Sequence, residues 1–278
     1  MTPETPRTIL VPLDGTEHAL AALPVAATLA QLETAMLHIV HVTERAPSPR
    51  ELIADLHLDP RALERAVVER LAGAPEDAII DAAVRMKARF ITLCTHTADD
   101  KPWGQLGHVA EEVMRRAPCP VVLVQPGRGT APFRLGSVLF PHDGTPTSAA
   151  ALGPATELAD RAGATLHVLH VATSAQPTTE EQGTLGAPRY LDQPQHEWPA
   201  WTREFLERLG SCSRLPKDVH LALAHGDPKE EVIRFATARH VDLILVAWRG
   251  RLEEQHAGIV KAALWRGPAP VMVMRVEG

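Results

Sequence analysis

The stretches ILVPLDGT at residues 9–16 and VLFPHDGT at residues 138–145 decide how this chain of 278 residues folds. Each starts with apolar residues that suit a short buried strand and ends in an Asp-Gly-Thr turn. The offset between them is 129 residues, and it also carries Leu37-His38-Ile39 onto Leu166-His167-Val168. Ordered matches at one constant offset indicate an internal repeat. The chain is therefore interpreted as two copies of one unit, and function has to be asked of each copy.

The two copies also end alike, with APCPVVLV at residues 117–124 and GPAPVMVM at residues 267–274, now at an offset of 150. The second copy therefore gains 24 residues after its second strand and loses three from a later loop. Residues 173–200 are rich in Pro, Gln, Thr and Gly and are predicted to be an inserted surface loop. We expect domains at 1–127 and 134–278, joined by a Pro- and Gly-rich linker.

Apolar runs alternate with Ala- and Leu-rich helical segments in both copies, which predicts βαβ crossovers and an α/β fold. Each domain is expected to be a doubly wound, mostly parallel, five-stranded sheet of Rossmann-like type. Residues 67–71 carry a weak strand pattern and could instead be helical. Pro24 and Pro154 fall inside helical patterns and are expected to kink them.

Composition excludes several classes of partner. The net charge is −6 and no long basic run is present, so nucleic acid is not an expected partner. No apolar stretch approaches the length of a membrane span, and the first ten residues have no apolar signal region. The three cysteines form no spacing motif, which favours a reduced, cytoplasmic setting.

The sequence lacks the common motifs of catalytic sites. It has no Ser-His-Asp order, HExxH, GxSxG or Walker pattern, so no catalytic residue is assigned and an enzyme is not expected. His38 and His41 invite a metal interpretation, as do His167 and His170. Residues three apart in a strand face opposite sides, so one ion cannot easily use both members of a pair, and no metal site is predicted.

Several motifs occur in the same order in both copies: a strand followed by Pro-x-Asp-Gly-Thr, then Leu-His, then a Pro-containing segment directly before the last strand. In this order the chain resembles a tandem universal stress protein, and the resemblance covers nearly its whole length. Many members of that family bind ATP and others do not. The binders use an Asp after the first strand, an apolar residue after Leu-His, and a loop G-x-x-G-(nine residues)-G-[S/T] around the phosphates. Glycine there lets backbone N–H groups approach phosphate oxygens.

By this resemblance, the first copy's nucleotide site consists of residues from the first strand, the second strand and the phosphate loop. They are Pro12, Leu13, Asp14, Ile39, Cys94, Thr95, His96, Thr97, Gly107, His108 and Val109. The nine-residue spacing from Thr97 to Gly107 is kept. The chemistry departs from the family, because Cys94 and Thr97 replace glycines and His108 replaces Ser or Thr. Asp99 and Asp100 add charge that repels a triphosphate.

The equivalent site in the second copy is expected to use Pro141 and His142 together with Asp143, Val168, Gly250 and Gly258. Its loop is three residues shorter, so Gly258 stands in for the final glycine only with a slipped register. Trp248 is bulky and lies near the loop's start.

Several of these residues also have a simpler, purely structural interpretation. Asp14 and Asp143 are either nucleotide ligands or turn formers that cap the next helix. Trp103 and Trp248 either stack on a base or fill a cavity, and cavity filling is favoured for Trp248. Cys94 is expected to be a thiol at the mouth of the loop, with no paired base to activate it.

These observations predict a cytoplasmic stress-response protein that binds or regulates rather than catalyses, with at most weak binding of ATP or AMP. The alternatives are an ATP-binding and ATP-hydrolysing stress protein, and an interaction scaffold that binds no ligand. The two copies are expected to form an intramolecular pseudo-dimer, with residues 121–124 antiparallel to residues 271–274.

Overall fold

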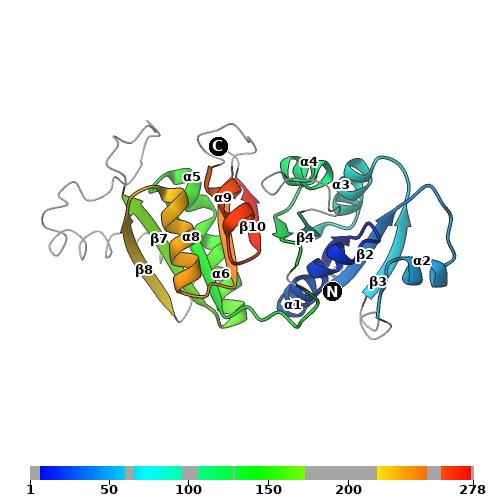
Figure 1. The fold of residues 1–278 in the computed structure, drawn as a ribbon, viewed down its shortest axis with the longest axis horizontal. Helices are drawn as coiled ribbons and strands as arrows, with labels where there is room; N and C mark the ends of the chain where they lie inside the picture. Colours follow the sequence, from blue (N-terminus) through cyan, green and yellow to red (C-terminus); the bar gives the residue numbers. More distant parts are fainter. Residues whose placement is uncertain are drawn as a thin grey trace, which may run out of the picture. The chain divides into compact units, whose positions relative to one another are not determined.

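A computed structural model describes residues 7–59, 66–95, 106–127, 129–172, 218–248 and 258–276. The chain forms two compact units, drawn in Figure 1. The first contains residues 1–134 together with residues 270–273, and the second contains residues 135–269 and 274–278. The predicted insertion at 173–200 lies outside the described residues.

The first unit alternates strands and helices, as the sequence predicted. Its elements are β1 (Thr8–Pro12), the 3-10 helix η1 (Glu17–Ala21), α1 (Ala22–Glu33), β2 (Met36–Val42), α2 (Pro49–Asp55), β3 (Ala66–Leu71), α3 (Pro75–Arg85), β4 (Ala88–Cys94), α4 (His108–Arg116) and β5 (Val121–Val124). The strands lie in the order β3-β2-β1-β4-β5 and all pair in parallel.

Strand β3 settles the weakest prediction in the first copy, because residues 66–71 are a strand and not a helix. Its register on β2 runs from Leu37 opposite Ala66 to Val42 opposite Leu71. The consecutive residues Glu69, Arg70 and Leu71 suit a helix as well as an edge strand. Residues 66–71 form a strand because they pair with β2, a choice between strand and helix that their own short sequence pattern could not make.

The second unit repeats this arrangement. Its elements are β6 (Ser137–Pro141), α5 (Pro146–Ala150), α6 (Leu152–Ala162), β7 (Thr165–Ala172), β8 (Val219–His225), α8 (Pro228–Ala238), β9 (Leu243–Trp248), α9 (Gly258–Arg266) and β10 (Val271–Arg275). The strand order β10-β9-β6-β7-β8 corresponds to β5-β4-β1-β2-β3 of the first copy. The fold class predicted from the sequence is therefore confirmed.

The helix after the first strand is broken in both copies, near the two prolines. In the first copy a 3-10 helix ends at Ala21 and α1 begins at Ala22, two residues before Pro24. In the second, α5 ends at Ala150 and α6 begins at Leu152, two residues before Pro154. A proline ring clashes with the carbonyl four residues earlier, so a continuous α-helix cannot pass this point undistorted.

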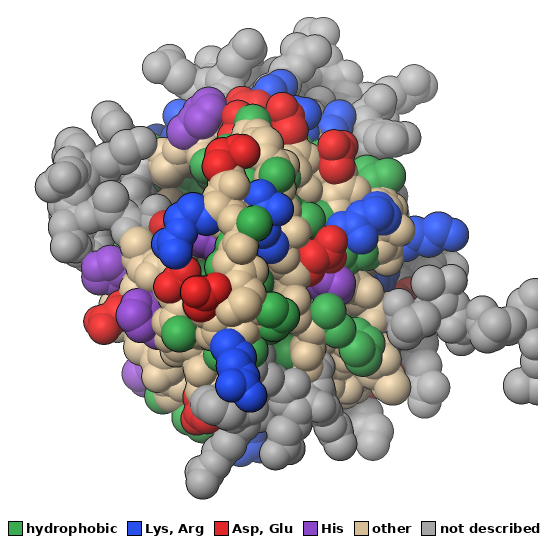
Figure 2. Space-filling model, turned by 90° about the vertical axis from the view of Figure 1, so that its right-hand side faces the viewer, with side chains coloured by type: hydrophobic (Ala, Val, Ile, Leu, Met, Phe, Trp, Pro, Cys, Tyr) green, Lys and Arg blue, Asp and Glu red, His purple; other side chains and the backbone are tan. Residues whose placement is uncertain are grey.

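The cores consist of the strands and the apolar faces of the helices. Three consecutive residues of β1, Ile9, Leu10 and Val11, are fully buried, and so are Val138, Leu139 and Phe140 of β6. Such continuous apolar runs are typical of parallel strands covered on both faces. On the face of the molecule shown in Figure 2, acidic and basic side chains are interspersed. Among the described helices, none has the length and apolar character needed to cross a bilayer.

Residues 271–273 of β10 pair antiparallel with β5, in the direction predicted from the sequence. Val271 lies opposite Leu123, and Val273 lies opposite Val121. These residues cluster with the first unit although they are separated from it in sequence. They occupy what would otherwise be an unpaired edge of the first sheet.

A fragment of residues 1–134 should therefore self-associate, because it retains β5 but lacks residues 270–273. Its exposed, fully apolar edge strand is a template for pairing with another chain. Sedimentation velocity should show dimers or larger species, and a synthetic peptide of residues 268–276 should suppress them. A stable monomeric fragment would show that the pairing with β10 is dispensable.

Candidate functional site

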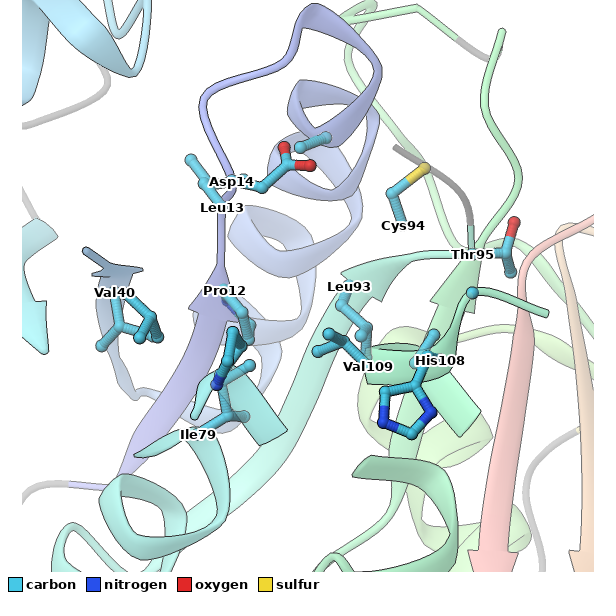
Figure 3. A pocket seen from close by; sticks show the side chains of 15 residues that line it. Pro12, Leu13, Asp14, Val40, Ile79, Leu93, Cys94, Thr95, His108 and Val109 are labelled. Carbon is cyan, nitrogen blue, oxygen red and sulfur yellow. The ribbon is translucent and has the colours of Figure 1, made fainter. Parts of the chain in front are cut away.

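The first unit contains a cavity of about 260 Å³ where the carboxyl ends of β1 and β4 meet the start of α4 (Figure 3). In the strand order β3-β2-β1-β4-β5, the connections reverse direction between β1 and β4. Ligands of open α/β sheets bind at such a switch point. The wall is formed by Pro12, Leu13, Asp14, Ala19, Val40, Val42, Pro75, Ile79, Leu93, Cys94, Thr95, Gly107, His108, Val109 and Ala110.

Asp14 lies in a tight turn that ends β1. The backbone N–H and the hydroxyl of Thr16 both donate to Asp14 Oδ1, at 3.0 and 2.8 Å. Thr16 Oγ1 in turn accepts from the N–H of Ala19 at 3.3 Å and caps the 3-10 helix. Gly15 has a φ of +92°, a conformation that side chains disfavour. Asp14 is thus a turn former whose carboxylate also lies on the cavity wall.

One strand position was assigned incorrectly by the resemblance. Ile39 is fully buried and does not line the cavity, whereas Val40 and Val42 do. Successive residues of a strand face opposite sides, so Ile39 points away when Val40 faces the cavity. His41 points to the same side as Ile39 and hydrogen-bonds through Nδ1 to the carbonyl of Leu13 at 2.7 Å, which ties β2 to the turn.

The far wall of the first cavity is the start of α4. Gly107 is the N-cap residue, and its N–H donates to the carbonyl of Thr95 at 3.0 Å. A Cβ at Gly107 would lie 3.1 Å from that carbonyl oxygen, so the backbone comes closer than a side chain comfortably allows. The first amides of a helix have no intrahelical acceptor and favour anions. His96 and Thr97, predicted for this loop, lie outside the described residues.

The second unit has a cavity at the equivalent place, with a smaller volume of about 150 Å³. Its wall is formed by Pro141, His142, Asp143, Thr145, Ser148, Leu169, Val171, Pro228, Val232, Val246, Ala247, Trp248, Ile259 and Val260. Val168 was predicted here, but it is buried and Leu169 and Val171 face the cavity, for the same reason of strand alternation. Gly258 begins α9 and is not part of the wall, while Gly250 lies outside the described residues.

The turn after β6 carries more polar groups than its counterpart. Thr145 donates from its N–H and hydroxyl to Asp143 Oδ1 at 3.0 and 2.7 Å, and the Ser148 hydroxyl donates to the same oxygen at 2.6 Å. The equivalent of Ser148 in the first copy is Ala19, which cannot make this bond. Ser148 was not among the residues predicted for this site, although the repeat offset of 129 pairs it with Ala19.

His142 replaces Leu13 and is buried, with 5% of its surface exposed. Its Nδ1 accepts from the N–H of Gly144 at 2.9 Å, which requires that nitrogen to be unprotonated. The carbonyl of His142 is bonded by Nδ1 of His170 at 2.9 Å, as the carbonyl of Leu13 is by His41. The two copies therefore share one strand-to-turn bond and differ in the side chain beside it.

The pKa values of two groups in the second cavity, His142 and Asp143, are shifted from their usual values. Burial lowers the pKa of His142 to about 4, against a weaker opposing effect of Asp143. Burial alone would raise the pKa of Asp143, but hydrogen bonds from Ser148 and Thr145 outweigh it and hold that pKa below its usual value. At neutral pH the cavity therefore presents a carboxylate beside an uncharged imidazole.

Trp248 takes the place of Thr95 at the end of the fourth strand of its copy. Its side chain is buried, with 2% of the residue exposed, and it lines the smaller cavity. A large ring in this position reduces the space that the first copy leaves open. The placement agrees with the expectation that Trp248 fills a cavity.

Comparison with known proteins gives a consistent result for both copies. The profile described as "Universal stress protein family" matches residues 5–125 and 135–275. A universal stress protein of Thermus aquaticus, in the "QAH/OAS sulfhydrylase 3'region", is 33% identical over 138 residues, which are 43% of this chain and 98% of that protein.

Solved structures agree in fold. A universal stress protein from Archaeoglobus fulgidus DSM 4304 superposes with a TM-score of 0.64 at 19% identity, covering 96% of this chain and 98% of that one. Another, described as a "Putative Universal Stress Protein" from Pseudomonas aeruginosa UCBPP-PA14, superposes with a TM-score of 0.67 at 18% identity, covering 97% of this chain and 93% of that one. With two profile matches that together span most of its length, the chain belongs to the universal stress protein family and carries two of its domains.

Proposed function

We propose that this chain is a non-catalytic, cytoplasmic binding protein of the stress response, in which the first domain binds an adenine nucleotide weakly and the second does not. The observation that carries the proposal is the cavity of about 260 Å³ at the switch point of the first sheet, bounded by the start of α4. Its counterpart in the second domain is smaller, with a volume of about 150 Å³, and is lined by Trp248.

The chemistry of the first cavity suits a base better than a long phosphate chain. Val40, Val42, Ile79 and Leu93 form an apolar wall against which a heterocycle can pack. Asp14 lies at the mouth and can accept hydrogen bonds from ribose hydroxyls. Near α4, Cys94 stands where nucleotide-binding relatives are expected to have a glycine. We therefore expect AMP or adenosine to bind more tightly than ATP.

An enzymatic role is the main rival, and a scaffold without ligand is the other. Hydrolysis of a nucleotide needs a positioned acid or base beside the phosphate. His108 is an ionisable wall residue at the start of α4, and its Nε2 lies 3.9 Å from Glu76 Oε1. Its side chain is largely exposed, so it is poorly shielded from water.

Replacing Gly107 by Val tests the location of the site. The added side chain would crowd the carbonyl of Thr95 and block the approach of a phosphate to α4. Calorimetric titration should show that the variant loses binding of AMP at least tenfold relative to the wild type. Gly258→Val at the start of α9 is the matched control, because its Cβ meets only the flexible side chain of Lys229, and it should bind as the wild type does.

Other outcomes separate the rivals. Tight ATP binding that survives Gly107→Val and is lost in Gly250→Val would place the site in the second domain. Phosphate release from ATP by the wild type, lost in His108→Ala, would establish the enzyme. Absence of any binding of ATP, AMP or adenosine would leave the scaffold as the function.

A further inference from the structure

The second cavity differs from the first in polarity as well as in size. Two apolar residues of the first wall, Leu13 and Ala19, are replaced by His142 and Ser148 at the same repeat positions. Burying polar groups costs free energy unless they are hydrogen-bonded. Ser148 joins Thr145 in a hydrogen-bond network on Asp143, and His142 Nδ1 accepts from the N–H of Gly144; the side chains of Ala19 and Leu13 cannot make the equivalent bonds.

The charge of this network is negative. Ser148 and Thr145 together direct three hydrogen bonds to one oxygen, Asp143 Oδ1, and stabilise the ionised carboxylate. His142 contributes no positive charge near neutral pH, because burial keeps it unprotonated. No Lys or Arg occurs among the residues of the wall that the structure describes. Within the described wall an anion would meet this carboxylate without a cation, and Lys229, which follows Pro228 of the wall, has its Nζ 3.8 Å from Asp227 Oδ2.

The rest of the wall is apolar, and its size is limited. Leu169, Val246 and Ile259 line it together with the ring of Trp248. An apolar cavity of about 150 Å³ is large enough to bind benzene. An aromatic ring such as that of Trp248 also attracts cations. The cavity thus combines space for one small ring or short hydrocarbon with an anion and an aromatic side chain.

We propose that the second domain binds a small organic ammonium ion, with its hydrocarbon part in the apolar cavity and its charged nitrogen at Asp143. The ligand differs in charge and size from a nucleotide, so the tandem chain has two sites of different specificity. This second site does not depend on the first: failure of nucleotide binding in the first domain leaves it unaffected.

Three probes of one shape and different charge test the proposal on the full chain. They are benzylamine, which is a cation at neutral pH, benzyl alcohol, which is neutral, and benzoate, which is an anion. Dissociation constants come from ligand-observed NMR titrations. We expect one saturable benzylamine site per chain, binding about tenfold more tightly than benzyl alcohol, since a hydrogen bond to a charged group is worth more than a neutral one. Benzoate should bind more weakly than the alcohol.

Asp143→Asn is the decisive variant. Its amide oxygen can still accept from Thr145 and Ser148, so the turn should keep its structure. In this variant benzylamine and benzyl alcohol should bind with about equal dissociation constants. The dissociation constant of benzyl alcohol should stay as in the wild type, which would show that the cavity is intact. Asp14→Asn, the same change at the equivalent position of the first cavity, should leave the preference as in the wild type.

The proposal is overturned by any of four results: no saturable benzylamine binding, a preference that survives Asp143→Asn, loss of the preference in Asp14→Asn, or benzoate binding as tightly as benzylamine. The benzoate arm matters because Arg249 and Arg251 follow Trp248 in the sequence and lie outside the described residues. If these arginines made the site cationic, benzoate would bind best.

Discussion

Acidification from pH 7 to pH 4 should weaken the wild-type protein by about 3 kcal/mol more than a His142→Leu variant. The pKa of His142 is lowered from 6.5 to about 4 because its imidazole is buried. The folded state therefore favours the neutral ring. This contribution is fully present above the unfolded pKa and is lost as the pH falls towards the folded pKa, at about 1.4 kcal/mol per pH unit. The loss should occur between about pH 6.5 and pH 4.

Urea unfolding at intervals of one pH unit, followed by circular dichroism, measures the effect. Leucine is the residue that the first copy has at the equivalent position, so the variant should fold. Some pH dependence should remain in it, because burial also lowers the pKa values of His167 and His170. His225→Leu removes an exposed histidine from the same unit and serves as the control for the loss of a histidine as such. Equal slopes for wild type and His142→Leu would contradict the role given to burial.

Trp248→Thr should lower the free energy of unfolding by about 3–5 kcal/mol, the usual cost of removing a large buried aromatic side chain. The change gives the second cavity the residue that the first copy has at Thr95, and it should enlarge a cavity that is now about 150 Å³. The size of the loss measures how far the indole is structural rather than a surface on which a ligand stacks. Chemical denaturation of the wild type and the variant provides the value.

Two further variants make the result specific. Trp248→Phe keeps an aromatic ring and should cost clearly less than Trp248→Thr. Thr95→Trp is the reciprocal change in the first unit: Thr95 is buried, so a larger side chain must displace the residues packed around it and should lower stability by about 1–3 kcal/mol. A loss of less than about 1 kcal/mol in Trp248→Thr would mean that the indole contributes little to packing.

Local sequence was sufficient for the strands, the turns and the repeat. Residues 9–16 and 138–145 contain an apolar run and an Asp-Gly-Thr turn, and each of these features acts over a few residues. Threonine caps a helix by bonding to an amide three residues on, and glycine supplies the positive φ that the turn needs. The breaks near Pro24 and Pro154 are local as well, because the proline ring clashes within one helical turn.

The wall of each cavity could not be derived in the same way. Ile39 and Val40 are both apolar, and only the pairing of β2 with its neighbours fixes which of them faces the ligand side. Which residues of a strand face a given side is decided by how the strand pairs in the sheet. An error of one residue therefore assigned both Ile39 and Val168 to the wrong face. Strand β3 likewise depended on pairing with β2, since its own residues favour neither state.

The repeated α/β unit of the universal stress protein family could be predicted without the structure, because repeats and strand-and-turn motifs are encoded in neighbouring residues. How the two cavities differ became visible only in the folded chain. Burial sets the pKa of His142. Trp248 lines the smaller of the two cavities, at the position that Thr95 has in the first copy. Each of these effects depends on which side chains and how much solvent surround a residue, and those surroundings exist only once distant segments have packed together.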